Sequence, residues 1–204
     1  QYLTEMSNIA IRWGGTIDKF IGDAIMVFFG DPVSRGQHED AIACVSMALE
    51  MLDKLEAIRH HWRDRGLAST LNARMGIHTG ACTVGNFGSE DRLDYTIIGR
   101  GVNLASRLES NSEPNKILIS EDTYLLIKSH IICEKREPIL VKGISYPVQT
   151  YEVVSLIDQD ARKARSIEKS MPGLSLSFDP SELEDNDTAI KLVADVMKRL
   201  TAPK

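Results

Sequence analysis

Asn103 and Arg107 are the side chains whose type and spacing most directly suggest chemistry. They are four residues apart in segment 102–110, whose apolar residues recur with helical periodicity, so both should lie on one face of a helix. The guanidinium of arginine is planar, permanently charged and rich in donors, which suits a site where negative charge builds up during a reaction. Such a pair usually forms only a solvated surface, so the spacing alone does not establish a site.

Asp23 is a candidate metal ligand. It follows Gly22 between two β-prone runs of segment 16–29, and this Gly-Asp pair predicts the tip of a β-hairpin. A hard carboxylate oxygen at that tip suits Mg²⁺ or Mn²⁺. Gly-Asp turns are also common for purely conformational reasons, and this explanation is favoured when the turn is considered alone.

Helices and strands that would position these residues follow from the hydrophobic pattern. Helices are expected over 2–13, 39–65, 121–128 and 187–200, the last with a polar cap at Asp187 or Thr188. Strands are expected over 71–78, 80–84, 94–98, 116–119, 137–141 and 148–154, with residues 85–88 as a turn. Strands and helices interleave without strict β-α-β order, so the sequence predicts an α+β sandwich.

The chain is expected to divide near residue 157. Residues 1–157 carry the interleaved pattern, whereas residues 158–204 read as a charged linker followed by an amphipathic helix of unknown role. The 204 residues, 43% of them hydrophobic, suffice for one core-forming domain and an appendage. The sequence does not begin with Met, so we expect a fragment of a longer protein, with a membrane anchor or sensor domain possible upstream.

Charge and cysteine content exclude several classes of protein. The formal net charge is −5 and basic residues are mixed with acidic ones, which argues against a nucleic-acid-binding face. The three cysteines lack the spacing of a zinc site or a disulfide scaffold, so reduced thiols and a cytoplasmic location are expected. No apolar run approaches the roughly 20 residues of a membrane-spanning helix.

Four sequence motifs, taken together and in order, are more specific than these separate signals. They are Asp-Lys-Phe-Ile-Gly-Asp-Ala at 18–24, Arg-Met-Gly-Ile-His-Thr-Gly at 74–80, Tyr-Thr-Ile-Ile-Gly at 95–99 running into Val-Asn-Leu-Ala-Ser-Arg-Leu-Glu at 102–109, and Val-Lys-Gly at 141–143. Together they resemble the catalytic domain of class III nucleotidyl cyclases, of the bacterial adenylyl cyclase type, over roughly residues 1–155.

The resemblance implies a ferredoxin-like, palm-like α+β fold with a mostly antiparallel sheet. It implies an adenylyl cyclase that converts ATP into 3′,5′-cyclic AMP and pyrophosphate for signal transduction, with two Mg²⁺ or Mn²⁺ ions at each site. In this family two domains pair head to tail, so a homodimer is expected. Each site would take Asp23 from one chain and five residues from its partner: Lys19, Thr96, Asn103, Arg107 and Lys142.

Site residues carry over onto matching positions of this sequence. Asp23 matches a metal-binding aspartate, and Asn103 and Arg107 match the ribose-positioning asparagine and the arginine that stabilises the pentacoordinate α-phosphate. Lys142 matches the lysine that holds the β- and γ-phosphates, and Arg74 an arginine near the phosphates. His78 lies in a matching strand and turn, where a hydrogen-bonded structural histidine is favoured over a general base.

Lys19 and Thr96 match the pair that reads the purine. A lysine ammonium can donate to the adenine N1, and a threonine hydroxyl can accept from the exocyclic amine or bridge to it, whereas guanine has a donor at N1 and a carbonyl beyond it. Guanylyl cyclases of this type carry glutamate in place of the lysine, so ATP is expected as the substrate. Threonine at this position resembles the bacterial, bicarbonate-responsive subgroup, which makes a bicarbonate response a further hypothesis.

The pattern departs from the family at its start. The family's first metal aspartate belongs to a Phe-x-Asp-Ile-x-Gly-Phe-type block on an opening strand, and this block does not occur in the sequence. The chain as given is therefore expected to bind metal poorly, to be nearly inactive and to lack a central strand, whereas a longer parent should be active. Alternatives are a non-catalytic ATP-binding regulatory domain, a guanylyl cyclase and, with least support, a diguanylate-cyclase-like enzyme.

Overall fold

We describe the chain from a computed structural model. Its contacts divide the chain into two units, Gln1–Leu156 and Ile157–Lys204, and each is described by itself. The structure describes residues 1–67, 71–89, 92–141, 146–157, 167–171, 174–178 and 185–201.

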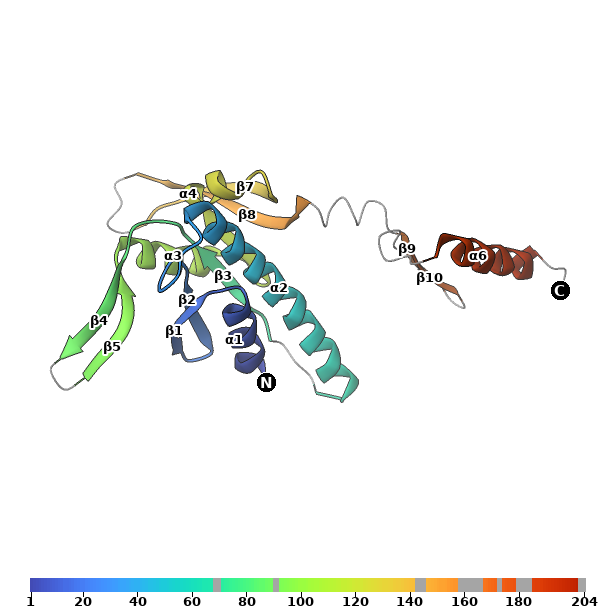
Figure 1. The fold of residues 1–204 in the computed structure, drawn as a ribbon, viewed down its shortest axis with the longest axis horizontal. Helices are drawn as coiled ribbons and strands as arrows, with labels where there is room; N and C mark the ends of the chain where they lie inside the picture. Colours follow the sequence, from blue (N-terminus) through green and yellow to red (C-terminus); the bar gives the residue numbers. More distant parts are fainter. Residues whose placement is uncertain are drawn as a thin grey trace. The chain divides into compact units, whose positions relative to one another are not determined.

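The first unit is an α+β structure, which confirms the expected class (Figure 1). A four-stranded sheet has the order β3-β6-β8-β7, in which β3 and β6 are parallel and the other neighbours antiparallel. Two antiparallel hairpins, β1–β2 and β4–β5, complete the strands of this unit. The strands are β1 (Thr16–Ile21), β2 (Ala24–Phe28), β3 (Arg74–Ile77), β4 (Thr83–Ser89), β5 (Arg92–Ile98), β6 (Lys116–Ser120), β7 (Ile131–Ile139) and β8 (Val148–Leu156). The helices are α1 (Tyr2–Arg12), α2 (Gln37–Asp64), α3 (Arg100–Asn111) and α4 (Glu121–Ile127).

Helices cover both faces of the four-stranded sheet. Alternation along β6 directs Ile117 and Ile119 into a core with α2 and α4, whereas Leu118 packs in a second core with Leu104 and Leu108 of α3. The first half of α2 buries apolar residues, among them Ala41, Val45 and Ala48, against the sheet. None of the helices among the described residues has both the length and the apolarity needed to span a membrane.

A third core joins α1 and the β1–β2 hairpin to α2. Met6 and Ile9 of α1 pack with Met51 of α2, and Val27 and Met75 lie against the same cluster. Although β2 and β3 share this core, β3 pairs only with β6 in the part of the chain that the structure describes. One edge of β3 therefore has no strand partner there.

Two features of the strand pattern differ from the sequence prediction. The turn expected at residues 85–88 is wrong: these residues lie inside β4, which pairs with β5 from Thr83↔Ile98 to Ser89↔Arg92. Glycine and asparagine suggested a turn, but a hairpin that extends away from the helices tolerates small side chains within its strands (Figure 1). Strand β7 also begins earlier than expected, at Ile131 rather than residue 137.

The second unit contains an antiparallel pair, β9 (Ile167–Met171) with β10 (Leu174–Phe178), and helix α6 (Asn186–Thr201). Helix α6 was predicted, but its cap is different. The Asp185 carboxylate accepts a hydrogen bond from the backbone N–H of Thr188 at 3.3 Å, so Asp185 caps the helix rather than Asp187 or Thr188.

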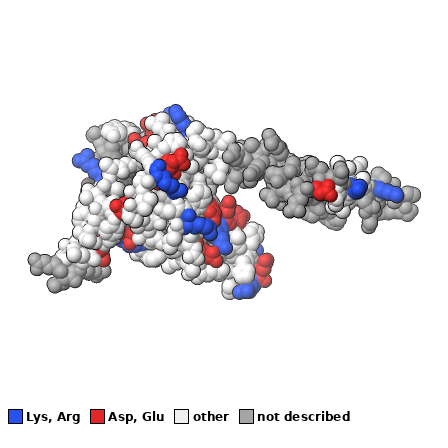
Figure 2. All heavy atoms as spheres, viewed as in Figure 1, with Lys and Arg blue, Asp and Glu red and all other residues white. Residues whose placement is uncertain are grey.

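Basic and acidic side chains are interspersed on the face of the first unit seen in Figure 2. One ion-pair network has a buried carboxylate at its centre: Glu152 accepts from Lys116 Nζ at 2.8 Å and from Arg136 Nη2 at 2.8 Å, and both cations are partly exposed. Burial alone would raise the pKa of Glu152, but the hydrogen bonds and charges of Lys116 and Arg136 outweigh it and lower that pKa overall. Glu152 thus ties β8 to β6 and β7.

Glu152→Gln should destabilise the first unit by about 1–3 kcal/mol, because the cations keep partial solvation but lose a charged acceptor. The folded-state pKa is lowered, so this contribution is present at neutral pH and is lost as the pH falls through that lowered pKa. Denaturant unfolding of both proteins from pH 7 to pH 3 should therefore show a shrinking difference. A difference independent of pH would contradict the assignment.

Candidate active site

Asp23 lies at the tip of the β1–β2 hairpin, as predicted. The hairpin closes with Ile21↔Ala24, so Gly22 and Asp23 form a two-residue turn. Gly22 has φ +65°, a left-handed conformation that glycine adopts without steric cost. The Asp23 side chain is exposed, and its charge adds to the effect of burial in raising the pKa of Tyr2 on α1.

The fit to a divalent cation can be tested on this hairpin. The described residues contain no group of three acidic, histidine or cysteine side chains that could hold a metal by themselves. Mg²⁺ is commonly bound by one or two carboxylates together with substrate phosphates. An exposed carboxylate at a hairpin tip fits that arrangement as one ligand, with the nucleotide supplying others.

Lys19 and Thr96, the predicted purine readers, meet at a third residue, Asp18. Lys19 lies on β1 and Thr96 on β5, far apart in the sequence. The Thr96 hydroxyl donates a hydrogen bond to Asp18 Oδ2 at 2.8 Å, and Lys19 Nζ lies 3.7 Å from Asp18 Oδ1. The Asp18 side chain is fully buried, whereas that of Lys19 is 43% exposed.

The contacts of Asp18 with Thr96 and Lys19 were not predicted from the sequence. The position of Asp18 is explained by an irregularity in β1: Ile17 pairs with Val27 and Lys19 with Met26, so Asp18 has no partner across the hairpin. Such a β-bulge changes the direction of neighbouring side chains. An acidic residue in the middle of a strand was the only signal in the sequence, and it did not indicate which way the side chain points.

Asn103 and Arg107 lie one turn apart on α3, as predicted. Both are exposed, and they flank Leu104 and Leu108, which anchor the helix in the core. Neither side chain takes part in a hydrogen bond or ion pair among the described residues. Their donors are therefore available to a ligand.

Gly76 of β3 determines where α3 lies. A Cβ atom at this position would be 2.1 Å from the backbone nitrogen of Glu109 and 2.3 Å from the carbonyl oxygen of Ala105. The helix backbone consequently rests directly on the strand, and no residue with a side chain can occupy the position without moving it.

Arg74 also contacts α3. Its Nε donates to Glu109 Oε1 at 3.1 Å, and both side chains are partly exposed. This pair ties Arg74 to α3, while its role at the phosphates stays a prediction. Lys142 lies outside the described residues, although Val141 before it is buried.

His78 has the surroundings of a structural residue. Its Nδ1 lies 2.8 Å from Ser120 Oγ, and a Cβ at Gly101 of α3 would be 3.1 Å from the His78 ring. Burial lowers the pKa of His78, although the nearby Asp122 carboxylate acts in the opposite direction. The neutral ring therefore supports the start of α3, in agreement with the structural interpretation.

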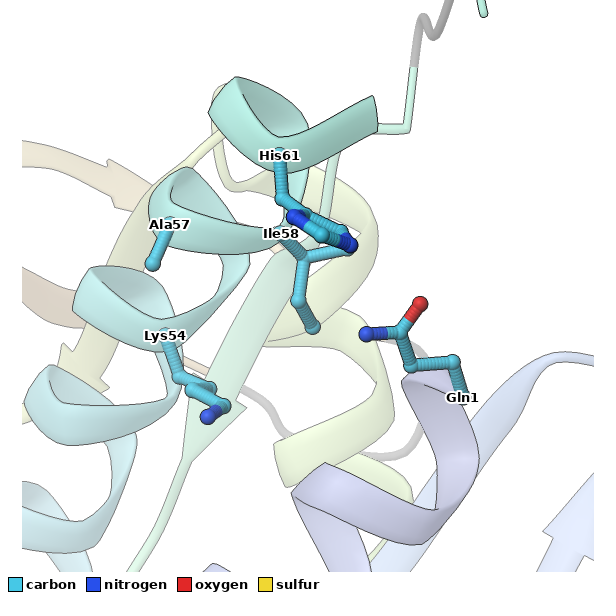
Figure 3. A pocket seen from close by; sticks show the side chains of 5 residues that line it. All are labelled: Gln1, Lys54, Ala57, Ile58 and His61. Atoms are coloured by element: carbon cyan, nitrogen blue, oxygen red, sulfur yellow. The ribbon is translucent and has the colours of Figure 1, made fainter. Parts of the chain in front are cut away.

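A cavity of about 210 Å³ lies away from all of these residues (Figure 3). It is lined by Gln1, Lys54, Ala57, Ile58 and His61, between the start of α1 and the second half of α2. Ligand pockets commonly measure about 300–1,000 Å³. This cavity is smaller and contains none of the predicted site residues, so we do not assign the nucleotide to it.

Comparison with known proteins identifies the family. Residues 14–155 match the family described as the adenylate and guanylate cyclase catalytic domain. The chain belongs to this family. The cyclase domain thus contains the hairpin with Asp23, the Lys19–Asp18–Thr96 cluster and α3.

Solved structures show the cyclase fold. The adenylyl cyclase CyaB from P. aeruginosa is 58% identical with a TM-score of 0.73, over 76% of this chain and 79% of that chain. The guanylyl cyclase Cya2 is 34% identical with a TM-score of 0.70, over 76% and 77% of the two chains. The predicted class III cyclase fold is therefore confirmed.

Curated relatives are much longer than this cyclase domain. Adenylate cyclase 1 of Rhizobium meliloti (strain 1021) is 31% identical over 159 residues, which are 77% of this chain but 24% of that protein. The matched region is thus one part of that relative.

Gly76→Ala should displace α3 and destabilise the cyclase domain by about 1–3 kcal/mol, because the added methyl group would overlap the helix backbone. Hydrogen exchange should show faster exchange of the α3 amides. Gly85→Ala is the matched control, since a Cβ there would meet only the Phe87 ring at an ordinary 3.6 Å. Equal effects of both substitutions would contradict the role given to Gly76.

Proposed function

We propose that this domain is the catalytic domain of an adenylyl cyclase, which converts ATP into 3′,5′-cyclic AMP and pyrophosphate. The observation that carries the proposal is the meeting of Lys19 and Thr96 at the Asp18 carboxylate. The two residues that match the purine-reading pair of the family thereby belong to one cluster. The 58% identity to a solved adenylyl cyclase supports the same substrate.

Adenine suits this cluster by its hydrogen-bonding edge. The Lys19 ammonium donates to the N1 acceptor, and the Thr96 oxygen accepts from the exocyclic amine. Guanine has a donor at N1 and an acceptor at position 6, so both contacts would have the wrong polarity. A site built on such hydrogen bonds discriminates strongly, because a mismatched base leaves buried polar groups unpaired.

The phosphate end of the substrate would lie along α3. Asn103 orients the ribose, so that its 3′-hydroxyl faces the α-phosphate, and the Arg107 guanidinium stabilises negative charge on the pentacoordinate phosphorus. Lys142 and Arg74 hold the outer phosphates, which positions pyrophosphate as the leaving group. Two Mg²⁺ or Mn²⁺ ions, one held in part by Asp23, supply Lewis-acid activation of the hydroxyl and charge neutralisation when bound.

Each site would be shared between two chains in a head-to-tail homodimer. Asp23 comes from one chain, and Lys19, Thr96, Asn103, Arg107 and Lys142 come from its partner. Large apolar side chains on both hairpins are exposed in the single chain, including Phe20, Ile21, Leu93 and Ile98, at 47–61%. Apolar surface of this kind favours an interface with another chain.

The cytosol is the proposed location of the domain, where ATP is available and thiols stay reduced. Burial raises the pKa of Cys44 to about 12 and that of Cys133 to about 11. Both side chains therefore stay protonated and unreactive at neutral pH.

The full-length protein, incubated with ATP or GTP and Mg²⁺ or Mn²⁺, should form cyclic AMP from ATP and little cyclic GMP. Mass spectrometry of the products decides between the possibilities. Cyclic GMP as the main product would indicate a guanylyl cyclase. Nucleotide binding without a cyclic product would indicate a regulatory domain.

Arg107→Ala in the full-length protein should lower kcat by about two to three orders of magnitude, because a preorganised donor to the transition state is lost. Arg107 is exposed, so the melting temperature should change little. Arg63→Ala, at an exposed position near the end of α2, is the matched control and should keep full activity. Full activity of Arg107→Ala would contradict the assignment.

Mixing Asp23→Ala chains with Arg107→Ala chains should restore part of the activity that each variant lacks alone. In a mixed dimer with shared sites, one site combines the intact Asp23 of one chain with the intact Arg107 of the other. Titration of one variant with the other, followed by cyclic AMP formation, measures this recovery. Absence of any recovery would show that the two residues act within one chain.

A further inference from the structure

We propose that Asp18 is a positioning residue for base specificity: by accepting a hydrogen bond from the Thr96 hydroxyl, it leaves the threonine oxygen able only to accept a hydrogen bond from the base. The proposal rests on the proposed function, because it assigns Thr96 to the purine. It extends that function by explaining how a threonine, which by itself can donate or accept, distinguishes adenine from guanine.

The geometry of β1 places the Asp18 side chain next to both proposed base-reading residues, Lys19 and Thr96. Asp18 occupies the bulge between Ile17 and Lys19, and its side chain is completely buried. Its Oδ2 atom accepts the hydrogen bond from Thr96 Oγ1 at 2.8 Å. A buried carboxylate on a bulge is an unfavourable arrangement unless its oxygens have partners.

The donors and acceptors of the Thr96 hydroxyl and the Asp18 carboxylate determine the direction of the hydrogen bond between them. An ionised carboxylate only accepts, so the hydrogen between Thr96 and Asp18 must come from the hydroxyl. A hydroxyl has one hydrogen and two lone pairs, and that hydrogen is engaged by Asp18. The remaining lone pairs suit the amine of adenine, whereas the position-6 oxygen of guanine would face another acceptor.

The second carboxylate oxygen connects Lys19 to the same residue. Asp18 Oδ1 is buried and has no hydrogen bond, and Lys19 Nζ is 3.7 Å away. An ammonium has three N–H donors, so contact with Asp18 leaves donors for the base. The partly exposed lysine is thereby held beside a threonine of fixed polarity.

The test is Asp18→Asn in the full-length protein, with kcat/KM measured for ATP, GTP and ITP. Asparagine has nearly the same shape, but its amide group donates, so the Thr96 hydroxyl can turn and donate to a position-6 oxygen. The ratio of kcat/KM for ATP to that for GTP should fall by on the order of tenfold or more. ITP should improve relative to ATP in the same way, because it shares the position-6 oxygen of guanine but lacks its 2-amino group.

Thr96 variants show whether Asp18 acts through this hydroxyl. Thr96→Ser keeps the hydroxyl and should keep the ATP preference, whereas Thr96→Val should lose activity with ATP more than with GTP. In the Thr96→Val background, Asp18→Asn should change the ratio no further. If Asp18→Asn fails to fold, the Ser and Val variants alone test the polarity, and equal loss for both nucleotides in Thr96→Val would overturn the proposal.

The wild-type protein separates failure of this proposal from failure of the proposed function. A wild type that prefers GTP would overturn the function itself. A wild type that prefers ATP, together with an Asp18→Asn variant that loses activity equally with ATP and GTP, would leave the function standing and show that Asp18 is only structural. Circular dichroism and thermal unfolding of each variant confirm that folded proteins are compared.

Discussion

Direct contact between the backbones of β3 and α3 is the constraint on which the candidate active site depends. A strand normally separates itself from a helix by a layer of side chains, but at Gly76 that layer is absent. This contact fixes the distance between α3 and the sheet. The packing of Leu104 and Leu108 fixes the rotation of α3 about its own axis. Asn103 and Arg107 then face solvent because of this packing, although neither contributes to it.

The residues proposed for base recognition and those proposed for the reaction lie in different physical surroundings. The Asp18–Thr96 contact is buried, where a hydrogen bond is strong and a mismatch is costly. Asp23, Asn103 and Arg107 are exposed in the single chain, where water would weaken their electrostatic effect. In the proposed dimer the second chain would exclude that water. Pairing would therefore strengthen the electrostatic effect of these groups, and it would also bring together the residues that one chain alone does not supply to a site.

Sequence patterns predicted most of the helices because burial of an apolar stripe at helical spacing determined them, as in α2. The hairpin tip at Asp23 was also predictable, since Gly22 supplies the backbone conformation that a two-residue turn needs. The contact of Asp18 with Thr96 was not predictable, because it depends on a bulge and on a strand almost eighty residues away. Glycines at 85 and 88 favour a turn locally, but strand pairing overcame this preference. Resemblance to the family, rather than periodicity, indicated Lys19, Thr96 and Lys142 as site residues, and their roles stay predictions.

The register of the β4–β5 hairpin matters for the proposed base recognition as well as for the fold. Thr96 is buried and stands opposite Gly85, while its neighbour Tyr95 is exposed. Side chains alternate along a strand, so a slip of the two strands by a single residue would present a tyrosine or an isoleucine to Asp18 instead of a hydroxyl of the right length. On the proposed assignment, the choice between two nucleotides would then be lost without any change in the amino acids that contact them. Fidelity in this enzyme would be a property of how two strands are aligned.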